Sequence, residues 1–227
     1  ITQQPASQTV PAGTNVTFTA TVTGTNPTGT VAFKDGGASI AACSAVALVG
    51  GGNSRTAACT TNTLAAGTHS IVATYSGDAN NTESHEACGA LTESSHERSV
   101  VSKAPTSLRT TASNAQLPLG TITDTVTIGG GTSSATGTIT VGVYSDSSCD
   151  SAALATWTIT VAGMGSYVTS PAYTPTAAAD YYWLASYGGD ANNLPSSEDC
   201  GAVTEVSNEV SHVSKAQPTV TTEATPA

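Results

Sequence analysis

Short runs of alternating apolar and polar residues recur along the chain. In NVTFTATVTG (15–24) apolar side chains occupy every second position, and threonine fills most of the positions between them. GTVAFKD (29–35) and HSIVATYSGD (69–78) continue this period of two. Such alternation predicts β-strands with one face turned to a core and the other to solvent.

The chain also repeats itself. YSGDANN (75–81) matches YGGDANN (187–193) at an offset of 112 residues, and ACGALTE (87–93) matches DCGAVTE (199–205) at the same offset. Internal repetition of this kind indicates successive units of one fold. Matching strands of the two units supply rows of side chains that we expect to point inward: Ile71, Ala73 and Tyr75, and Trp183, Ala185 and Tyr187.

The repeat divides the chain into units. Recurring VSKA segments predict one domain over residues 1–102, a second over 103–213, and the first strand of a truncated third repeat over 214–227. About seven short strands per hundred residues, separated by Gly, Asn and Pro turns, are typical of an immunoglobulin-like (Ig-like) sandwich. We therefore expect an all-β protein of tandem Ig-like β-sandwiches. Tyr181 stands where such a fold places a tyrosine corner.

Charge and composition narrow the functional classes. The formal net charge is -10, from 16 acidic and 6 basic residues, so phosphate backbones and anionic membrane surfaces are repelled. No apolar run approaches the roughly 20 residues needed to span a bilayer. Motifs for nucleophilic hydrolases, zinc proteases, phosphate-binding loops and dinucleotide binding are missing from the sequence. We expect no enzyme activity, no cofactor, no nucleic-acid partner and no direct membrane insertion.

Five cysteines without a CxxC pair fit an oxidising, extracellular compartment. Cys149 and Cys200 are alone in the second domain, so a disulfide between them is expected; the alternative is two free thiols. Cys43 and Cys59 flank the turn GGGN, and we expect them to pair across a hairpin, which leaves Cys88. The alternative pairs Cys43 with Cys88. An odd cysteine in a secreted chain predicts a free thiol or an intermolecular bond.

The segments TGTVAFKDGGASI, LAAGTHSIVATYSGDANN and PTAAADYYWLASYGGDANN resemble the bacterial Ig-like repeats of large cell-surface and adhesin proteins. The resemblance covers essentially the whole chain. It implies an extracellular location on a microbial cell surface and a role as a stalk or adhesive array, without naming a ligand.

Lys103, Asp124 and Asn208 form a candidate site for covalent chemistry. Alternation in TITDTVTI (121–128) turns Asp124 inward, and Asn208 shares a face with the valines on either side of it. A buried lysine beside an acid can lose its charge and attack an asparagine amide, which releases ammonia. The order lysine, acid, asparagine resembles the intramolecular isopeptide domains of bacterial adhesins. The alternative is that Lys103 is a solvated linker residue.

The two GDANN loops place oxygen-bearing side chains at alternate positions, as a calcium loop does. Asp78 and Asn80 lie in the first loop, and Asp190 and Asn192 in the second. The remaining features of an EF-hand are missing, and Asp and Asn also form ordinary turns by bonding to their own backbone. These residues are therefore weak calcium candidates, and no metal is expected.

The hypothesis that follows is a structural spacer in an extracellular surface or fibre protein. Its partners would be neighbouring repeats of the same polypeptide, together with other copies if the parent forms a fibre. One alternative is an adhesive module that binds a glycan or a host protein. Another is a subunit of a covalently stabilised filament. Aromatic residues make up 5% of the chain and mostly occupy inward strand positions, which favours the spacer.

Overall fold

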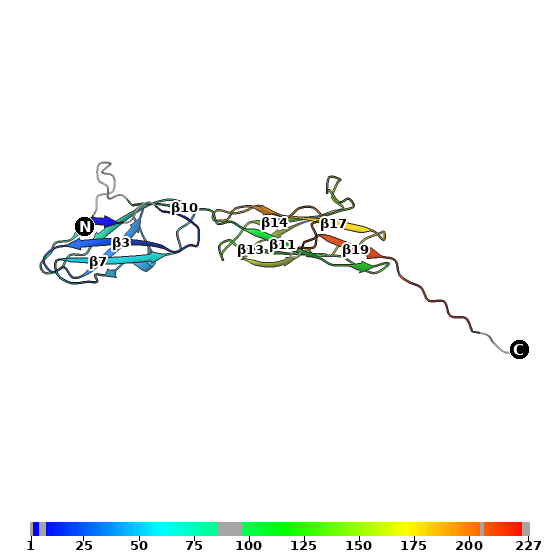
Figure 1. Ribbon diagram of the computed structural model, residues 1–227, viewed down its shortest axis with the longest axis horizontal. Coiled ribbons are helices and arrows are strands. Elements are labelled where there is room, and N and C mark those ends of the chain that lie inside the picture. Colours follow the sequence, from blue (N-terminus) through cyan, green and yellow to red (C-terminus); the bar gives the residue numbers. More distant parts are fainter. Residues whose placement is uncertain (1, 5–7, 86–96, 205–206, 224–227) are drawn as a thin grey trace. The chain divides into compact units, whose positions relative to one another are not determined.

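The computed structural model describes the chain except for residues 1, 5–7, 86–96, 205–206 and 224–227. Two compact units are present: unit 1 comprises Ile1–Ala104 with Ala191–Asn193, and unit 2 comprises Pro105–Asp190 with Leu194–Ala227. Both consist of strands and connecting loops (Figure 1). Within the described residues, no helix has the length and apolar character needed to cross a bilayer.

The described residues of unit 1 form ten strands and one turn of 3-10 helix. They are β1 (Thr2–Gln4), β2 (Gln8–Pro11), β3 (Val16–Thr23), β4 (Thr30–Asp35), β5 (Ala38–Ser39), η1 (Ala41–Cys43), β6 (Val46–Ala47), β7 (Ser54–Thr61), β8 (Gly67–Tyr75), β9 (Ser84–His85) and β10 (Glu97–Ser102). One sheet has the order β1-β3-β7, and the other has the order β2-β10-β8-β4-β5 with β6 beside β4 and β9 beside β8.

The core of unit 1 lies between these two sheets. Every second residue of β3 is buried, from Val16 to Val22, and the predicted inward row of β8 is buried as well. Phe18 and Phe33, one from each sheet, are almost completely buried. Apolar and polar residues of the sequence thus correspond to buried and exposed positions of the strands, because successive strand residues point to opposite faces of a sheet.

The part of unit 2 that the structure describes forms nine strands. They are β11 (Ser107–Ala112), β12 (Ala115–Gln116), β13 (Asp124–Gly129), β14 (Thr138–Tyr144), β15 (Ala155–Thr160), β16 (Gly165–Val168), β17 (Asp180–Tyr187), β18 (Ser196–Ser197) and β19 (Val210–Ser214). One sheet has the order β11-β13-β16, and the other has the order β12-β19-β17-β14-β15 with β18 beside β17.

Trp183 lies at the centre of the unit 2 core, with no exposed surface, and its indole donates a hydrogen bond to the Ser211 hydroxyl at 2.9 Å. Ala185 and Tyr187 are buried beside it, which confirms the predicted inward row of β17. The Tyr181 hydroxyl donates to the Ala177 carbonyl at 3.0 Å, four residues upstream, as in a tyrosine corner.

In each unit, part of the opening segment pairs in parallel with the last strand. In unit 1, β2 lies beside β10, and the Ala12 N–H donates to the Ser102 carbonyl at 2.8 Å. In unit 2, β12 lies beside β19, and the Leu117 N–H donates to the Ser214 carbonyl at 3.0 Å. The second strand of each unit therefore lies parallel to the last strand of that unit.

Residues 215–223 are exposed and form no strand. The repeat pattern predicts the opening strand of a third unit from residue 214. Opening strands of the described units lie beside a partner in their own unit, as β11 lies beside β13. Residues 215–223 have no strand partner in the described part of the chain, so the predicted strand is not formed there.

Candidate functional site

A tyrosine and an aspartate close one loop region of unit 1. The Tyr75 hydroxyl donates to the Thr28 carbonyl at 2.7 Å and to the Asp78 carboxylate at 3.0 Å. The second Asp78 oxygen accepts the Asn80 N–H and the Asn81 N–H, each at 2.8 Å. We call this arrangement the Tyr–Asp clasp, because it joins the loop after β8 to the loop before β4.

Hydrogen bonding decides the electrostatics of the clasp. The Thr28 N–H, 2.6 Å from the Asp78 carboxylate, and further donors hold the pKa of Asp78 well below its usual range. Burial, followed by the neighbouring Asp78 charge, raises the pKa of Tyr75. Both groups therefore keep their ordinary neutral-pH protonation states. Gly29 is required here: its φ is +89°, and a Cβ would lie 2.6 Å from the Ser76 hydroxyl.

Unit 2 contains the same clasp. The Tyr187 hydroxyl donates to the Thr136 carbonyl at 2.7 Å and to the Asp190 carboxylate at 3.2 Å. Asp190 also accepts the Thr136 N–H at 2.7 Å. Burial and the Asp190 charge raise the pKa of Tyr187 to about 12. The TGT and YxGD sequences, which occur once in each unit, thus form the same Tyr–Asp clasp in both units.

This geometry explains the GDANN loops without a cation. The Asp78 oxygens that would bind calcium already accept backbone and side-chain donors. Asn80 supplies its backbone N–H to that carboxylate. A calcium ion would have to displace these donors. Across the described ranges, no group of three or more His, Cys, Asp or Glu residues could hold a metal.

Two disulfides are formed, and they are the two that the sequence predicts. Cys43 pairs with Cys59 at a Cα–Cα distance of 5.5 Å, and Cys149 pairs with Cys200 at 5.8 Å. The expected hairpin geometry of the first pair is wrong, because Cys43 lies in η1 and is not a strand neighbour of Cys59 on β7. Cys88 lies outside the described residues.

The predicted lysine site draws on both units, since Lys103 belongs to unit 1, whereas Asp124 and Asn208 belong to unit 2. Asp124 and Asn208 lie at one end of β11, opposite Ala112 and Thr111 respectively. Lys103 is exposed. The Lys103–Asn208 cross-link stays a prediction.

The inward polar residue near the last strand is Glu209. Ser207, Glu209, Val210, Ser211 and Val213 are buried, whereas Asn208 is only half-buried. The prediction for Asn208 is therefore wrong by one residue. That for Asp124 is confirmed, since its side chain has no exposed surface. Positions 207, 209 and 211 hold serine and glutamate, which are residue types usually found at the surface. The sequence therefore did not show that these side chains face inward.

Glu209 and Asp124 form a pair of buried acids with Thr110. The Thr110 hydroxyl donates to Glu209 Oε1 at 2.6 Å. Neither Asp124 oxygen nor Glu209 Oε2, all of them buried, accepts a hydrogen bond of good geometry. Burial raises the pKa of Asp124 to about 7, although the Thr111 and Thr125 N–H groups partly offset it. Burial and the charge of Asp124 raise the pKa of Glu209 to about 8.

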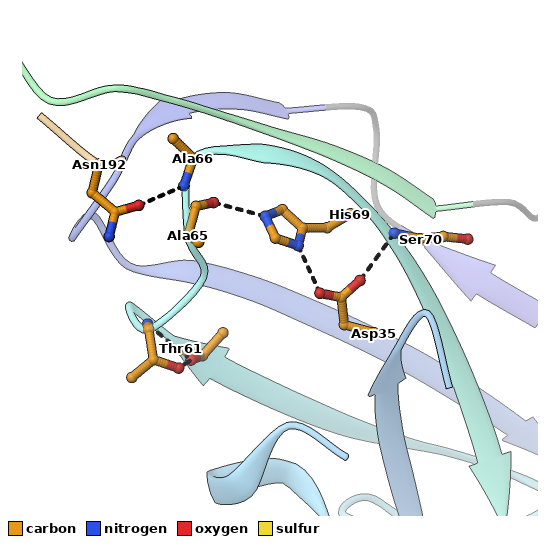
Figure 2. A network of polar contacts seen from close by, with 8 residues as sticks. Asp35, Thr61, Ala65, Ala66, His69, Ser70 and Asn192 are labelled. Carbon is orange, nitrogen blue, oxygen red and sulfur yellow. Dashed lines mark hydrogen bonds and ion pairs between the residues drawn. The ribbon is translucent and has the colours of Figure 1, made fainter. Parts of the chain in front are cut away.

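Figure 2 shows a second titratable pair, in unit 1. His69 Nδ1 lies 2.6 Å from Asp35 Oδ2, and its Nε2 lies 2.8 Å from the Ala65 carbonyl oxygen. Both ring nitrogens therefore face acceptors, an arrangement that only the protonated ring satisfies fully. Burial lowers the pKa of His69, but the Ala65 carbonyl and Asp35 outweigh it, and the net pKa is raised.

Comparison with known proteins gives one match. Residues 1–92 match the family described as bacterial Ig-like domain (group 3). The matched segment includes β1 to β9, η1 and the unit 1 clasp. Comparison with curated proteins gives no match.

Proposed function

We propose that this chain is a structural spacer of an extracellular bacterial surface protein, a role supported by the match of residues 1–92 to the bacterial Ig-like domain (group 3) family. In this proposal the two units are tandem Ig-like repeats that transmit tension along the polypeptide. Neighbouring repeats of the same polypeptide are their direct partners.

The parallel pairing of the second strand of each unit with its last strand carries this proposal. β2 and β10 pair over four residue positions, from Ser99 opposite Gln8 to Ser102 opposite Pro11. Tension that enters at the start of one strand and leaves at the end of its parallel neighbour pulls the two in opposite directions. The hydrogen bonds between them are then loaded together rather than one after another. This is the geometry expected of a module that must resist extension.

Features away from the terminal strands support the same role. Each unit has its own core, one disulfide and one Tyr–Asp clasp. Disulfides persist in oxidising compartments, which supports an extracellular location. Each clasp is held by donors of its own unit, and therefore serves the loops rather than a ligand.

Single-molecule force spectroscopy of the full chain tests this proposal. We expect two unfolding events that differ in length, because the disulfides withhold 16 residues in one unit and 51 in the other. Ala12→Pro removes the N–H that bonds Ser102, and should lower the unfolding force of the unit 1 event alone. Thr222→Pro, at an exposed position outside every strand, is the control and should change neither event.

Equilibrium denaturation of the same variants separates mechanical from thermodynamic effects. The proposal requires the unfolding force of Ala12→Pro to fall by a larger fraction than its free energy of unfolding. An unchanged unfolding force in Ala12→Pro, or wild-type units that extend without a force peak, would contradict a load-bearing role.

A further inference from the structure

The strand β15 forms an open edge of its sheet in unit 2. It pairs with β14 on one side, and no described strand lies on its other side. The Val161 N–H donates to the Gly137 carbonyl at 2.9 Å, which sets the alternation along the strand: odd-numbered residues bond to β14 and even-numbered residues face away from it. The main-chain groups that face away belong to Thr156, Thr158 and Thr160, which are all exposed.

Two edge strands of unit 1 are protected against pairing, whereas β15 is not. The strand at the same place in the unit 1 sheet is β5, which has two residues. The other edge strand, β7, carries Arg55, and Val49 exchanges main-chain hydrogen bonds with Thr56 beside it. Short strands, charges and covering segments are the means by which proteins keep sheet edges from pairing. By contrast, β15 has six residues, ATWTIT, with neither a proline nor a charge.

The sequence around β15 is uncharged in an otherwise acidic chain. Residues 151–179, which include β15 and β16, contain no Asp, Glu, Lys, Arg or His, although the formal net charge of the chain is -10. Leu154, directly before β15, and Val168, on the edge strand β16, are exposed apolar side chains. Like charges repel two copies of an acidic chain. Two copies therefore meet with least repulsion along this uncharged segment.

Trp157 is fixed at the open edge. Its indole Nε1 donates to the Pro171 carbonyl at 2.9 Å, and its ring centroid lies 5.5 Å from that of Trp183. The side chain is nevertheless only half-buried, so part of a large aromatic surface stays in contact with solvent. Tryptophan is enriched among the residues that contribute most to protein interfaces. The edge thus offers an apolar anchor beside its main-chain donors and acceptors.

We propose that β15 pairs antiparallel with β15 of a second copy of this chain, so that two unit 2 sheets become one continuous sheet. The two-fold axis passes Thr158, which faces its counterpart, and Thr156 faces Thr160 of the second copy. Every outward main-chain group of these threonines then has a partner, and a shift of register would leave some of them unpaired.

The side chains of β15 suit the same register. Trp157 faces Ile159 of the second copy, and a pair of an aromatic and a β-branched residue stabilises antiparallel strands. A second copy is favoured over a foreign strand because β15 complements itself in hydrogen bonding and brings no charge to the contact. The pairing joins chains side by side and goes beyond the spacer role proposed above.

Sedimentation equilibrium of the full chain tests the pairing, in a Cys88→Ser background so that this cysteine cannot link two chains. We expect a reversible monomer–dimer equilibrium. Thr158→Pro removes an N–H that points away from β14, a place where an edge strand tolerates proline. It should raise the dissociation constant at least about tenfold, with circular dichroism used to verify that it folds. Thr222→Pro, outside every strand, is the control and should dimerise as its parent does.

Cysteine cross-linking tests the register and does not depend on the proline variant. Directly opposed residues of a hydrogen-bonded antiparallel pair have Cα atoms about 5.5 Å apart, a distance that a disulfide spans. Thr158→Cys, in the same background, should therefore form a covalent dimer on mild oxidation. Thr160→Cys is the matched control and should not, because Thr156 of the second copy lies opposite position 160.

Three results would overturn the inference. A Cys88→Ser chain that stays monomeric up to about 1 mM excludes the pairing and leaves β15 to a strand of another protein. A folded Thr158→Pro variant that dimerises as tightly as its parent places the contact elsewhere on the molecule. Cross-linking of Thr160→Cys in preference to Thr158→Cys overturns the two-fold axis at Thr158.

Discussion

The hydroxyl of Tyr75 lies 3.0 Å from the carboxylate of Asp78, three residues along the chain, and donates a hydrogen bond to it. The same hydroxyl contacts the Thr28 carbonyl at 2.7 Å. One phenol therefore secures a turn within its own loop and a contact 47 residues away. Tyr187 and Asp190 repeat the relationship in unit 2.

Tyr75→Phe should destabilise unit 1, because the Thr28 carbonyl and Asp78 lose a buried donor while the ring still packs. We expect the melting temperature of that unit to fall by about 5 °C, measured by differential scanning calorimetry. Tyr182→Phe is the matched control, since its hydroxyl bonds to none of the described residues. A Tyr75→Phe transition that coincides with wild type would show that the clasp adds no stability.

Removing the Cys149–Cys200 bridge should cost more stability than removing Cys43–Cys59. The bridges span 51 and 16 residues. Loop-closure entropy then gives about 4 kcal/mol for the longer loop and about 3 kcal/mol for the shorter one. Paired Cys→Ser variants in a Cys88→Ser background, unfolded in guanidinium chloride, measure both values. The reverse order would indicate that enthalpy or residual structure in the unfolded chain dominates.

Asp124 should make unit 2 less stable as the pH rises. Its folded pKa is raised to about 7, above the unfolded value of about 3.9, so the folded state binds the proton more tightly. The associated stability is fully present below pH 4 and is lost between about pH 4 and pH 7. The loss amounts to at most about 4 kcal/mol.

Denaturant unfolding of the wild type and of Asp124→Asn from pH 4 to pH 8 measures this effect. The slope of stability against pH should become flatter in the variant, because asparagine does not titrate. The comparison uses slopes, so it does not depend on the absolute stability of Asp124→Asn. Parallel profiles would mean that Asp124 is ionised in the folded core at low pH.

The His69–Asp35 pair should contribute stability to unit 1 at low pH. The folded pKa of His69 is raised above 6.5. Its contribution is therefore complete below the unfolded pKa and disappears as the pH rises through the folded value. NMR titration should show that Asp35→Asn lowers the His69 pKa. Asp180→Asn, which alters the exposed His212 pair, is the control and should leave the His69 pKa unchanged. If Asp35→Asn also left the His69 pKa unchanged, the assignment would be refuted.

Several residues were predictable because local pattern decides their environment. The rows from Val16 to Val22 and from Trp183 to Tyr187 follow the period of two, and these side chains are buried. The two disulfides followed from the number of cysteines per unit and from their spacing along the chain. Asp124 was recognised as inward because isoleucine and valine flank it in alternation.

Other features depended on contacts between distant segments. Glu209 stands between half-buried and buried neighbours, and only the bonds of its backbone to Ala202 and Trp183 decide which way it faces. Lys103 falls in the right chain order for a cross-link, but it belongs to unit 1, whereas Asn208 belongs to unit 2. From the sequence, the GDANN loops resemble cation-binding loops. In the structure, Thr28 and Thr136 donate hydrogen bonds from other loops to the aspartates of these loops.

Sequence alone therefore determined the strand period, the internal repeat and the cysteine pairs, because each rests on local spacing or on counting. Tertiary structure decided the parallel pairing of β2 with β10, the two clasps and the meeting of Thr110 with Glu209. These contacts join residues far apart in the chain, and their partners are chosen by strand register. A shift of one residue in that register turns a side chain from the core to the solvent.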